Sequence, residues 1–232
     1  VSIVTPTESH FNIGLEFLSR GVHVMMEKPV TNSTAEADQL IAEARKKGVI
    51  LQVGHLERFN GAYAALAGRL KSLPVYVEAH RLSPFPNRST DVDVVLDVMI
   101  HDIDLVLDVV KSSVKSIEAV GTPVVSASTD IANARLAFEN GCVASITASR
   151  VARGRVRKME IAARDSSATV DFMNQHLFVA TLAPGVDGGV GTLTEEQVEV
   201  AKTDAILEEL KAFVACVASG GRQNRCLYVF LS

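Results

Sequence analysis

The sequence predicts an α/β protein in which a parallel-sheet unit is followed by an α+β domain with a mostly antiparallel, open sheet. Two observations lead to this prediction. Strand and helix patterns alternate over residues 1–54, an order that pairs strands in parallel and places helices on the sheet faces. Beyond residue 75, strand patterns follow one another with little helix between them. We expect the two domains to span residues 1–56 and 57–232.

The first region reads as strand, helix, strand, helix, strand. The strands are short β-branched and apolar runs, and Gly21 and Gly48 stand where glycine usually ends a helix. Ser33-Thr34-Ala35-Glu36 matches a capping box, which predicts the start of the second helix. The predicted strands cover residues 1–4, 22–26 and 49–53, and the first predicted helix covers residues 9–20.

The second region contains most of the predicted strands. Asn140-Gly141 between two alternating runs is a strong signal for a tight hairpin. Predicted strands cover 75–82, 130–139, 142–150, 156–163, 168–173 and 176–182. Predicted helices cover 60–70, with Asn60 as the cap, 95–110 and 204–218, and a glycine-rich loop covers 185–192.

Composition excludes several classes of protein. The 232 residues are 47% hydrophobic and 22% charged, with a net charge of −4, which is ordinary for a folded globular protein. A mildly acidic chain has no electrostatic footprint for nucleic acid, and no apolar run approaches the length of a membrane span. Three cysteines without paired spacing favour a reducing compartment, so we expect a cytoplasmic protein.

Polar groups follow all three strands of the first region, at Thr5-Pro6, Glu27-Lys28-Pro29 and Gly54-His55. Units of this kind bind ligands at the carboxyl ends of their parallel strands. Lys28 at such an end could give or take a proton, or it could be an ordinary surface lysine in a turn. The residue types alone modestly favour the second interpretation.

Asp97 and His101 stand four residues apart on a predicted helix and therefore share a face. A carboxylate and an imidazole on one face can orient a hydroxyl group and take its proton. An ordinary polar stripe is an equally good interpretation. A metal site built from His101, Asp102 and Asp104 is weakly supported, because no paired ligand spacing accompanies it, and we predict none.

Several of these motifs resemble the Gfo/Idh/MocA family of NAD(P)-dependent oxidoreductases. The resemblance rests on residues 1–7 with His10, on 21–29 ending in Glu27-Lys28-Pro29, on Gly54 to Asn60, and on the helix from Asp97 to Asp104. It runs over nearly the whole chain, to about residue 222. It implies that the first region is part of a Rossmann-type nucleotide-binding domain and that the second binds substrate and forms oligomers.

The resemblance also implies roles for individual residues. Lys28, His101 and Asp97 are similar to the family's catalytic group, which handles the proton while a hydride moves between a sugar carbon and NAD or NADP. The remaining implied residues fall into two sets. The cofactor set is Thr5, Pro6, His10, Glu27, Lys28 and Gln52, and the substrate set is Arg58, Asn60, Arg81, Arg88 and Arg150. Arginines suit the phosphates of a nucleotide sugar.

One departure from the family pattern concerns the phosphate-binding loop. The expected G-x-G-x-x-G, which holds the pyrophosphate at a helix start, does not occur in the sequence, and the glycines of 185–191 lie in the wrong context. We therefore expect roughly 60 residues, or two βαβ units, to be missing before Val1. Residues 223–232 also look unrelated to the family. The choice between NAD and NADP is not readable.

Three functions stay open. The segment His80 to Arg88, with the residues that follow to Asp104, is similar to the family members that oxidise UDP-N-acetylglucosamine at C3. The alternatives are a catalytically silent fragment that only folds and oligomerises, and an NAD-assisted glycosidase of the same family. We expect a homodimer or homotetramer formed through the antiparallel sheet, because an uncovered sheet face commonly pairs with a second subunit.

Overall fold

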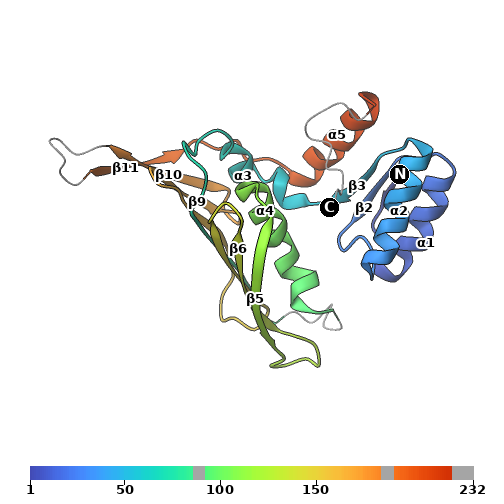
Figure 1. Ribbon diagram of the computed structural model, residues 1–232, viewed down its shortest axis with the longest axis horizontal. Coiled ribbons are helices and arrows are strands. Elements are labelled where there is room, and N and C mark those ends of the chain that lie inside the picture. Colours follow the sequence, from blue (N-terminus) through green and yellow to red (C-terminus); the bar gives the residue numbers. More distant parts are fainter. Residues whose placement is uncertain (86–91, 184–190, 221–232) are drawn as a thin grey trace. The chain divides into compact units, whose positions relative to one another are not determined.

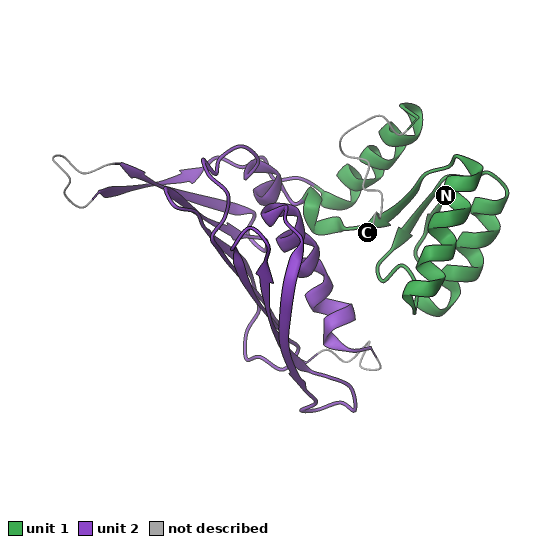
Figure 2. Cartoon of the chain, viewed as in Figure 1, with its two compact units in different colours: residues 1–59, 204–232 green, residues 60–203 purple. Residues whose placement is uncertain are grey.

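The computed structural model describes residues 1–85, 92–183 and 191–220. Arg88, most of the predicted glycine-rich loop and the tail from residue 221 lie outside the described residues. The chain divides into two compact units, Val1–Phe59 together with the chain from Asp204 onward, and Asn60–Thr203 (Figure 2). The first division lies close to the boundary expected at residue 56. At the other end, the last helix groups with unit 1, whereas we had expected it in the second domain.

Unit 1 is built on a parallel sheet with the strand order β1-β2-β3 (Figure 1). Its helices α1 and α2 pack on the sheet face that carries Val24, Met26 and Leu51. Helix α5 covers the opposite face, where Phe213 and Cys216 cluster with buried strand residues. The elements are β1 (Ser2–Ile3), α1 (Thr7–Ser19), β2 (Val24–Glu27), α2 (Thr34–Lys47), β3 (Leu51–Gly54), the 3₁₀ turn η1 (Leu56–Phe59) and α5 (Ala205–Ala218).

Local signals account for the limits of α2. The Ser33 hydroxyl accepts a hydrogen bond from the Glu36 backbone N–H at 3.3 Å, as the capping box predicts. Gly48 ends the helix in the left-handed conformation, with φ of 66°, a conformation that glycine adopts without steric penalty. The predicted strand–helix order of this region is confirmed.

Unit 2 contains an eight-stranded sheet in the order β11-β10-β9-β8-β4-β7-β6-β5. Among the described strands of this sheet, only the β4–β7 pair is parallel, and every other neighbouring pair is antiparallel, so the predicted mostly antiparallel sheet is confirmed. The strands are β4 (Tyr76–Leu82), β5 (Val114–Thr122), β6 (Ile131–Phe138), β7 (Val143–Ser149), β8 (Val156–Ala162), β9 (Ser166–Asp171), β10 (His176–Ala183) and β11 (Thr192–Val198). The hairpin predicted at Asn140-Gly141 joins β6 to β7, with Gly141 at φ of 85°.

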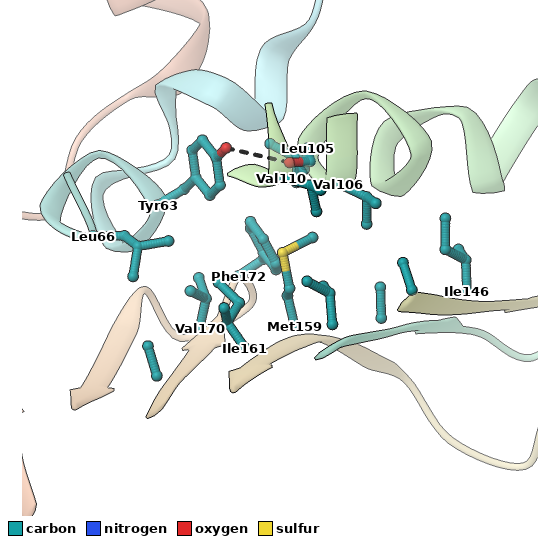
Figure 3. Packing of buried hydrophobic residues seen from close by; sticks show 14 of the residues in the cluster. Tyr63, Leu66, Leu105, Val106, Val110, Ile146, Met159, Ile161, Val170 and Phe172 are labelled. Atoms are coloured by element: carbon teal, nitrogen blue, oxygen red, sulfur yellow. Dashed lines mark hydrogen bonds between the residues drawn. The ribbon is translucent and has the colours of Figure 1, made fainter. Parts of the chain in front are cut away.

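Helices cover one face of this sheet and enclose the main core. Figure 3 shows Tyr63 and Leu66 from α3 (Gly61–Ala65) and its following turn, and Leu105 and Val106 from α4 (Ile100–Val110), pointing toward strand residues such as Ile161. The Asn60 side chain caps α3 by accepting from the Ala62 N–H at 3.1 Å. This helix is shorter than the 60–70 predicted.

The helix predicted over 95–110 is interrupted. Residues Val95–Met99 form a single π-helical segment, η2, which leads directly into α4. The periodicity of apolar residues does not reveal such a segment, because one wider turn hardly changes the spacing. Short π segments inside helices occur frequently at functional sites, and this one contains Asp97 and ends two residues before His101.

Candidate active site

His10 links the carboxyl ends of β1 and β2. Its Nδ1 lies 2.9 Å from the Pro29 carbonyl oxygen and its Nε2 2.8 Å from the Thr5 carbonyl oxygen, and the side chain is 1% exposed. The His10 ring therefore connects the turn after β1 to the turn after β2.

Glu27 and Lys28 occupy the turn that His10 holds. Both are partly buried, and the Lys28–Pro29 peptide bond is cis. Glu27 pairs in register with Gly54 of β3, and a side chain at Gly54 would begin only 3.1 Å from the Glu27 Oε1. Glycine at this position therefore leaves room for the Glu27 carboxylate at the carboxyl edge of the sheet.

Gln52 lies on the same sheet face, two residues before Gly54. The side chain is fully buried, and neither its amide nitrogen nor its amide oxygen has a hydrogen-bond partner. Thr5 and Pro6, at the end of β1, are exposed. This edge therefore carries accessible groups at adjacent strand ends, while the described residues include no glycine-rich cradle for a pyrophosphate.

Asp97 and His101 belong to unit 2, whereas Lys28 belongs to unit 1. Both side chains are partly exposed. Asp97 lies in η2 and His101 in the first turn of α4, so the two candidate acid/base groups flank the junction between π-helical and α-helical backbone. We predicted that Asp97 and His101 share a face by assuming a regular α-helix over both residues. The backbone is not regular α-helix across this junction.

Arg81 makes a buried ion pair that fixes α4 on the sheet. Its Nε and Nη2 donate to the two carboxylate oxygens of Asp102 at 2.8 and 2.9 Å, and both side chains are almost fully buried. The guanidinium also lies over the Phe172 ring, 5.7 Å from its centroid. Because Asp102 directly follows His101, this pair anchors the turn of α4 on which His101 lies. Arg81 was expected to bind substrate. In the structure, its guanidinium group binds the buried Asp102 carboxylate of the same domain.

Arg150 is the centre of a second buried network. Its Nε donates to Asp130 at 2.7 Å, and its remaining donors reach Ser126, Ser128 and the Val92 carbonyl. Burial raises the pKa of Asp130, but hydrogen bonds from the backbone of residues 124–126 and from the Ser126 hydroxyl outweigh it and hold that pKa well below its usual range. Arg150 thus secures the loop before β6 and the chain that enters η2. Its predicted contact with substrate has no support in this geometry.

The other expected substrate residues differ in their surroundings. Asn60 is buried, and its amide is engaged by the α3 cap and by the Phe172 carbonyl, to which it donates at 3.0 Å. Arg58 is partly exposed on η1. Among the described residues, no group of three or more His, Cys, Asp or Glu side chains could hold a metal ion, and the Asp102 carboxylate of the weak metal hypothesis is occupied by Arg81.

Sequence reasoning missed the structural roles of three acidic residues. Asp102 and Asp130 are the buried partners of Arg81 and Arg150. Glu209 on α5 is 2% exposed, and burial, together with the nearby Glu27 carboxylate, raises its pKa from 4.5 to about 7. Glu209 could have been found from the sequence, because it shares a face of the predicted helix with Phe213 and Cys216. A charged group on such an apolar face is costly.

Together, the parallel α/β unit with polar strand ends and the adjoining open-sheet domain define a nucleotide-dependent oxidoreductase. Residues 1–55 match the oxidoreductase family with an NAD-binding Rossmann fold, and residues 68–169 match the GFO/IDH/MocA C-terminal domain. The chain is 40% identical over 219 residues to UDP-N-acetylglucosamine 3-dehydrogenase of Acidithiobacillus ferrooxidans, covering 94% of this chain and 70% of that relative. The protein therefore belongs to the Gfo/Idh/MocA oxidoreductase family, and its first region is an NAD-binding domain.

Other relatives and solved structures agree with this assignment. The chain is 25% identical to scyllo-inositol 2-dehydrogenase (NAD(+)) of Bacillus subtilis, covering 95% of this chain and 68% of that protein. The solved A. ferrooxidans UDP-N-acetylglucosamine 3-dehydrogenase superposes with a TM-score of 0.88 over 94% of this chain and 70% of that one. Levoglucosan dehydrogenase in complex with NADH and L-sorbose, at 18% identity and a TM-score of 0.82 over 97% of this chain and 72% of that one, shares the fold. Among the described residues, no helix is both long and apolar enough to cross a bilayer.

Proposed function

We propose that the protein transfers a hydride between NAD(P) and C3 of UDP-N-acetylglucosamine or a closely related nucleotide sugar. The observation that carries this proposal is the 40% identity to a UDP-N-acetylglucosamine 3-dehydrogenase over almost the whole chain. The reaction class itself is supported by the family's NAD-binding domain. We further infer that the protein works in the cytoplasm.

The strand ends of unit 1 form the cofactor side of the proposed site. Thr5, Pro6 and Glu27 would line the nicotinamide end, with the buried amide of Gln52 behind them. When bound, the nicotinamide ring accepts or supplies the hydride. His10 contributes indirectly, because both of its ring nitrogens face the backbone carbonyls that shape this edge.

Lys28, His101 and Asp97 form the proposed proton-handling group. Oxidation of a hydroxyl group releases a proton from the oxygen, and a positioned base keeps charge from accumulating there. In this proposal, Lys28 stabilises the reacting oxygen, His101 exchanges its proton, and Asp97 orients the sugar. The Arg81–Asp102 ion pair would hold His101 in place through the adjacent residue.

The proposed contact to the diphosphate falls on Arg58 and Arg88. The other two candidates, Arg81 and Arg150, already donate to buried carboxylates, and breaking such a pair leaves an uncompensated charge. Arg58 lies on η1, directly after β3 and partly exposed, where its fork can reach a phosphate group. We therefore propose that Arg58, partly exposed on η1, contributes to recognition of the diphosphate.

We also propose that two or four copies associate through the sheet of unit 2. Its outer strands expose large apolar side chains at Ile117, Val120, Phe178, Leu182 and Leu193. The first two lie on β5 at one edge of the sheet and the other three on β10 and β11 at the opposite edge, and exposed apolar side chains on an open sheet commonly mark an interface between subunits. Light scattering on the purified protein tests this, and a monomeric mass at micromolar concentration would contradict it.

The test of the reaction uses protein expressed from its complete gene. With UDP-N-acetylglucosamine and NAD⁺, we expect a rise in the near-ultraviolet absorbance of reduced nicotinamide. The rise should disappear in Lys28→Ala and persist in Lys46→Ala, which removes an exposed lysine paired only with Glu43 on α2. No rise despite intact NADH binding would redirect the search to inositols and other sugars, and sugar cleavage without net reduction would favour the glycosidase.

A further inference from the structure

The loop of residues 150–155, which joins β7 to β8, crosses the carboxyl end of β4. Strands β7 and β8 both pair with β4 and lie on either side of it. The register sets Leu82, the last residue of β4, opposite Ser149 on β7 and Val156 on β8. A chain that leaves β7 after Ser149 and enters β8 at Val156 must therefore pass over this strand end.

The carboxyl end of β4 lies next to the helical turn that carries His101. Arg81, the residue before the last one of β4, holds Asp102 in the first turn of α4 through two hydrogen bonds. Segment η2, which contains Asp97, packs against β7. Because β4 and β7 run parallel, their carboxyl ends lie at one edge of the sheet. The loop that crosses β4 therefore lies at the same edge as the two candidate acid/base residues of unit 2.

Backbone hydrogen bonds fix the path of this loop. The Ala152 N–H donates to the Ser83 carbonyl at 2.9 Å, and the Ser83 N–H donates to the Ser149 carbonyl at 2.8 Å. The Val151 N–H donates to the Ser149 hydroxyl at 3.2 Å. The loop is therefore bound to the chain that leaves β4, and the residues that follow Ala152 start from a defined position.

Arg153 and Arg155 are the charged residues of this loop that have no partner. Both are exposed, and within the described part of the chain neither makes an ion pair or a side-chain hydrogen bond. Other exposed arginines, such as Arg69 and Arg135, pair with a glutamate. Residues 149–158 contain five basic residues and no acidic one, so this stretch offers no carboxylate to the two guanidinium groups.

Gly154 leaves open space between the two arginines. A side chain added at this glycine would meet no atom within 4 Å, and its φ is not positive. Guanidinium groups bind phosphate oxygens through paired hydrogen bonds. Two arginines that flank one small residue therefore suit the adjoining phosphates of a diphosphate.

We propose that Arg153 and Arg155 bind the diphosphate of a nucleoside diphosphate sugar while its sugar ring lies at the candidate acid/base residues. This inference rests on the proposed function, because it assigns residues to the class of substrate named there. It adds a basic loop of unit 2 to the recognition that we placed on Arg58 and Arg88. An unphosphorylated sugar or an inositol has no group for these arginines, so the loop favours nucleotide sugars over such substrates.

The experiment measures the Kd of UDP by isothermal titration calorimetry, using protein expressed from its complete gene. Saturating NADH is present and keeps UDP out of the cofactor site. In the Arg153→Gln/Arg155→Gln double variant we expect the Kd of UDP to rise about tenfold or more, because two charge-assisted contacts are lost. The Kd of uridine, which has no phosphate, should not change. With UDP-N-acetylglucosamine as substrate, the KM should rise by a similar factor while kcat and the Kd of NADH stay unchanged.

Arg164→Gln is the matched control. Arg164 is also exposed and, in the described structure, has no partner, but it lies beyond the other end of the seven-residue strand β8, roughly 20 Å away. This variant should bind UDP like the wild type. Gly154→Glu adds a carboxylate between the two arginines, in open space, and should also weaken UDP binding. Gly154→Gln, which is of similar size and neutral, should weaken it less.

Three results would overturn the proposal. They are a wild type that does not bind UDP, an unchanged Kd of UDP in the double variant, and an equal loss of UDP affinity in Arg164→Gln. The proposed function fails in a different way. Sugar oxidation with an unaltered KM in the double variant would contradict the role of the loop alone. UDP binding that depends on the two arginines, without oxidation of UDP-N-acetylglucosamine, would contradict the proposed reaction alone.

Discussion

Replacing Arg150 by methionine tests whether this arginine supports the fold or binds substrate. The substitution removes at least four hydrogen bonds, to Asp130, Ser126, Ser128 and the Val92 carbonyl, and leaves the fully buried Asp130 carboxylate without its cation. Removing one partner of a buried ion pair typically costs about 3–5 kcal/mol of unfolding free energy. We expect a loss in that range, a large share of the stability of an ordinary domain.

The assay is urea denaturation followed by circular dichroism at neutral pH. Arg135→Met is the control, because Arg135 forms a long, exposed pair with Glu118 at 3.9 Å and should cost less than about 1 kcal/mol. Arg150→Lys keeps the charge but loses the fork and should fall between them. A loss below about 1 kcal/mol for Arg150→Met, with a raised KM for the nucleotide sugar, would refute the structural role.

The same network predicts how stability depends on pH. The pKa of Asp130 is lower in the folded protein than in the unfolded chain, so its contribution is complete above the usual range of an aspartate and is lost as the pH falls through that range. The wild type should therefore lose more stability than Asp130→Asn between neutral pH and about pH 3. Equal losses in the two proteins would contradict this.

The remaining predictions concern the active site and α5. Lys28→Ala and His101→Ala should each lower kcat by about a hundredfold or more with little change in NADH affinity, and an unchanged kcat in steady-state assays would remove that residue from the mechanism. Asp97→Asn should reduce kcat less and raise the KM for the sugar, whereas loss of the folded state in circular dichroism would indicate a structural role. Because the folded pKa of Glu209 is raised to about 7, the wild type should lose up to about 3 kcal/mol of stability as pH rises from 4.5 through 7. Glu209→Gln should not show this loss in thermal unfolding, and a parallel decline in both proteins would argue against a buried neutral carboxyl group.

Local signals in the sequence were enough to predict much of the fold. The capping box at Ser33, the glycine at residue 48 and the Asn140-Gly141 hairpin act over a few residues, and each occurs where it was predicted. The π segment Val95–Met99 and the mostly exposed strands Val114–Thr122 and Thr192–Val198 were not predicted. Strand β11 is mostly exposed and rich in Glu and Thr, so it lacks the buried alternation by which strands are found.

The site was only partly predictable because partners of buried charges lie far apart in the sequence. The resemblance to the family located Lys28, Asp97 and His101, whose roles stay predictions. In the sequence, Arg81 and Arg150 cannot be distinguished from arginines that bind substrate. Only the fold shows that they pair with Asp102 and Asp130, which lie 20 or more residues away along the chain. A sequence pattern cannot separate an arginine that awaits a phosphate from one that already holds an aspartate.

The placement of α5 in unit 1 has a consequence for synthesis of the protein. Met25 and Ile50 emerge from the ribosome early, but their covering residues, Phe213 and Cys216, follow only after the whole of unit 2. The intervening stretch of roughly 150 residues takes about 7–30 s to translate. During that interval α5 is not yet present to cover one face of the nascent parallel sheet. A chaperone that binds apolar surface therefore has most time to bind at this face. A messenger truncated before α5 would release a chain in which Met25 and Ile50 lack their covering helix.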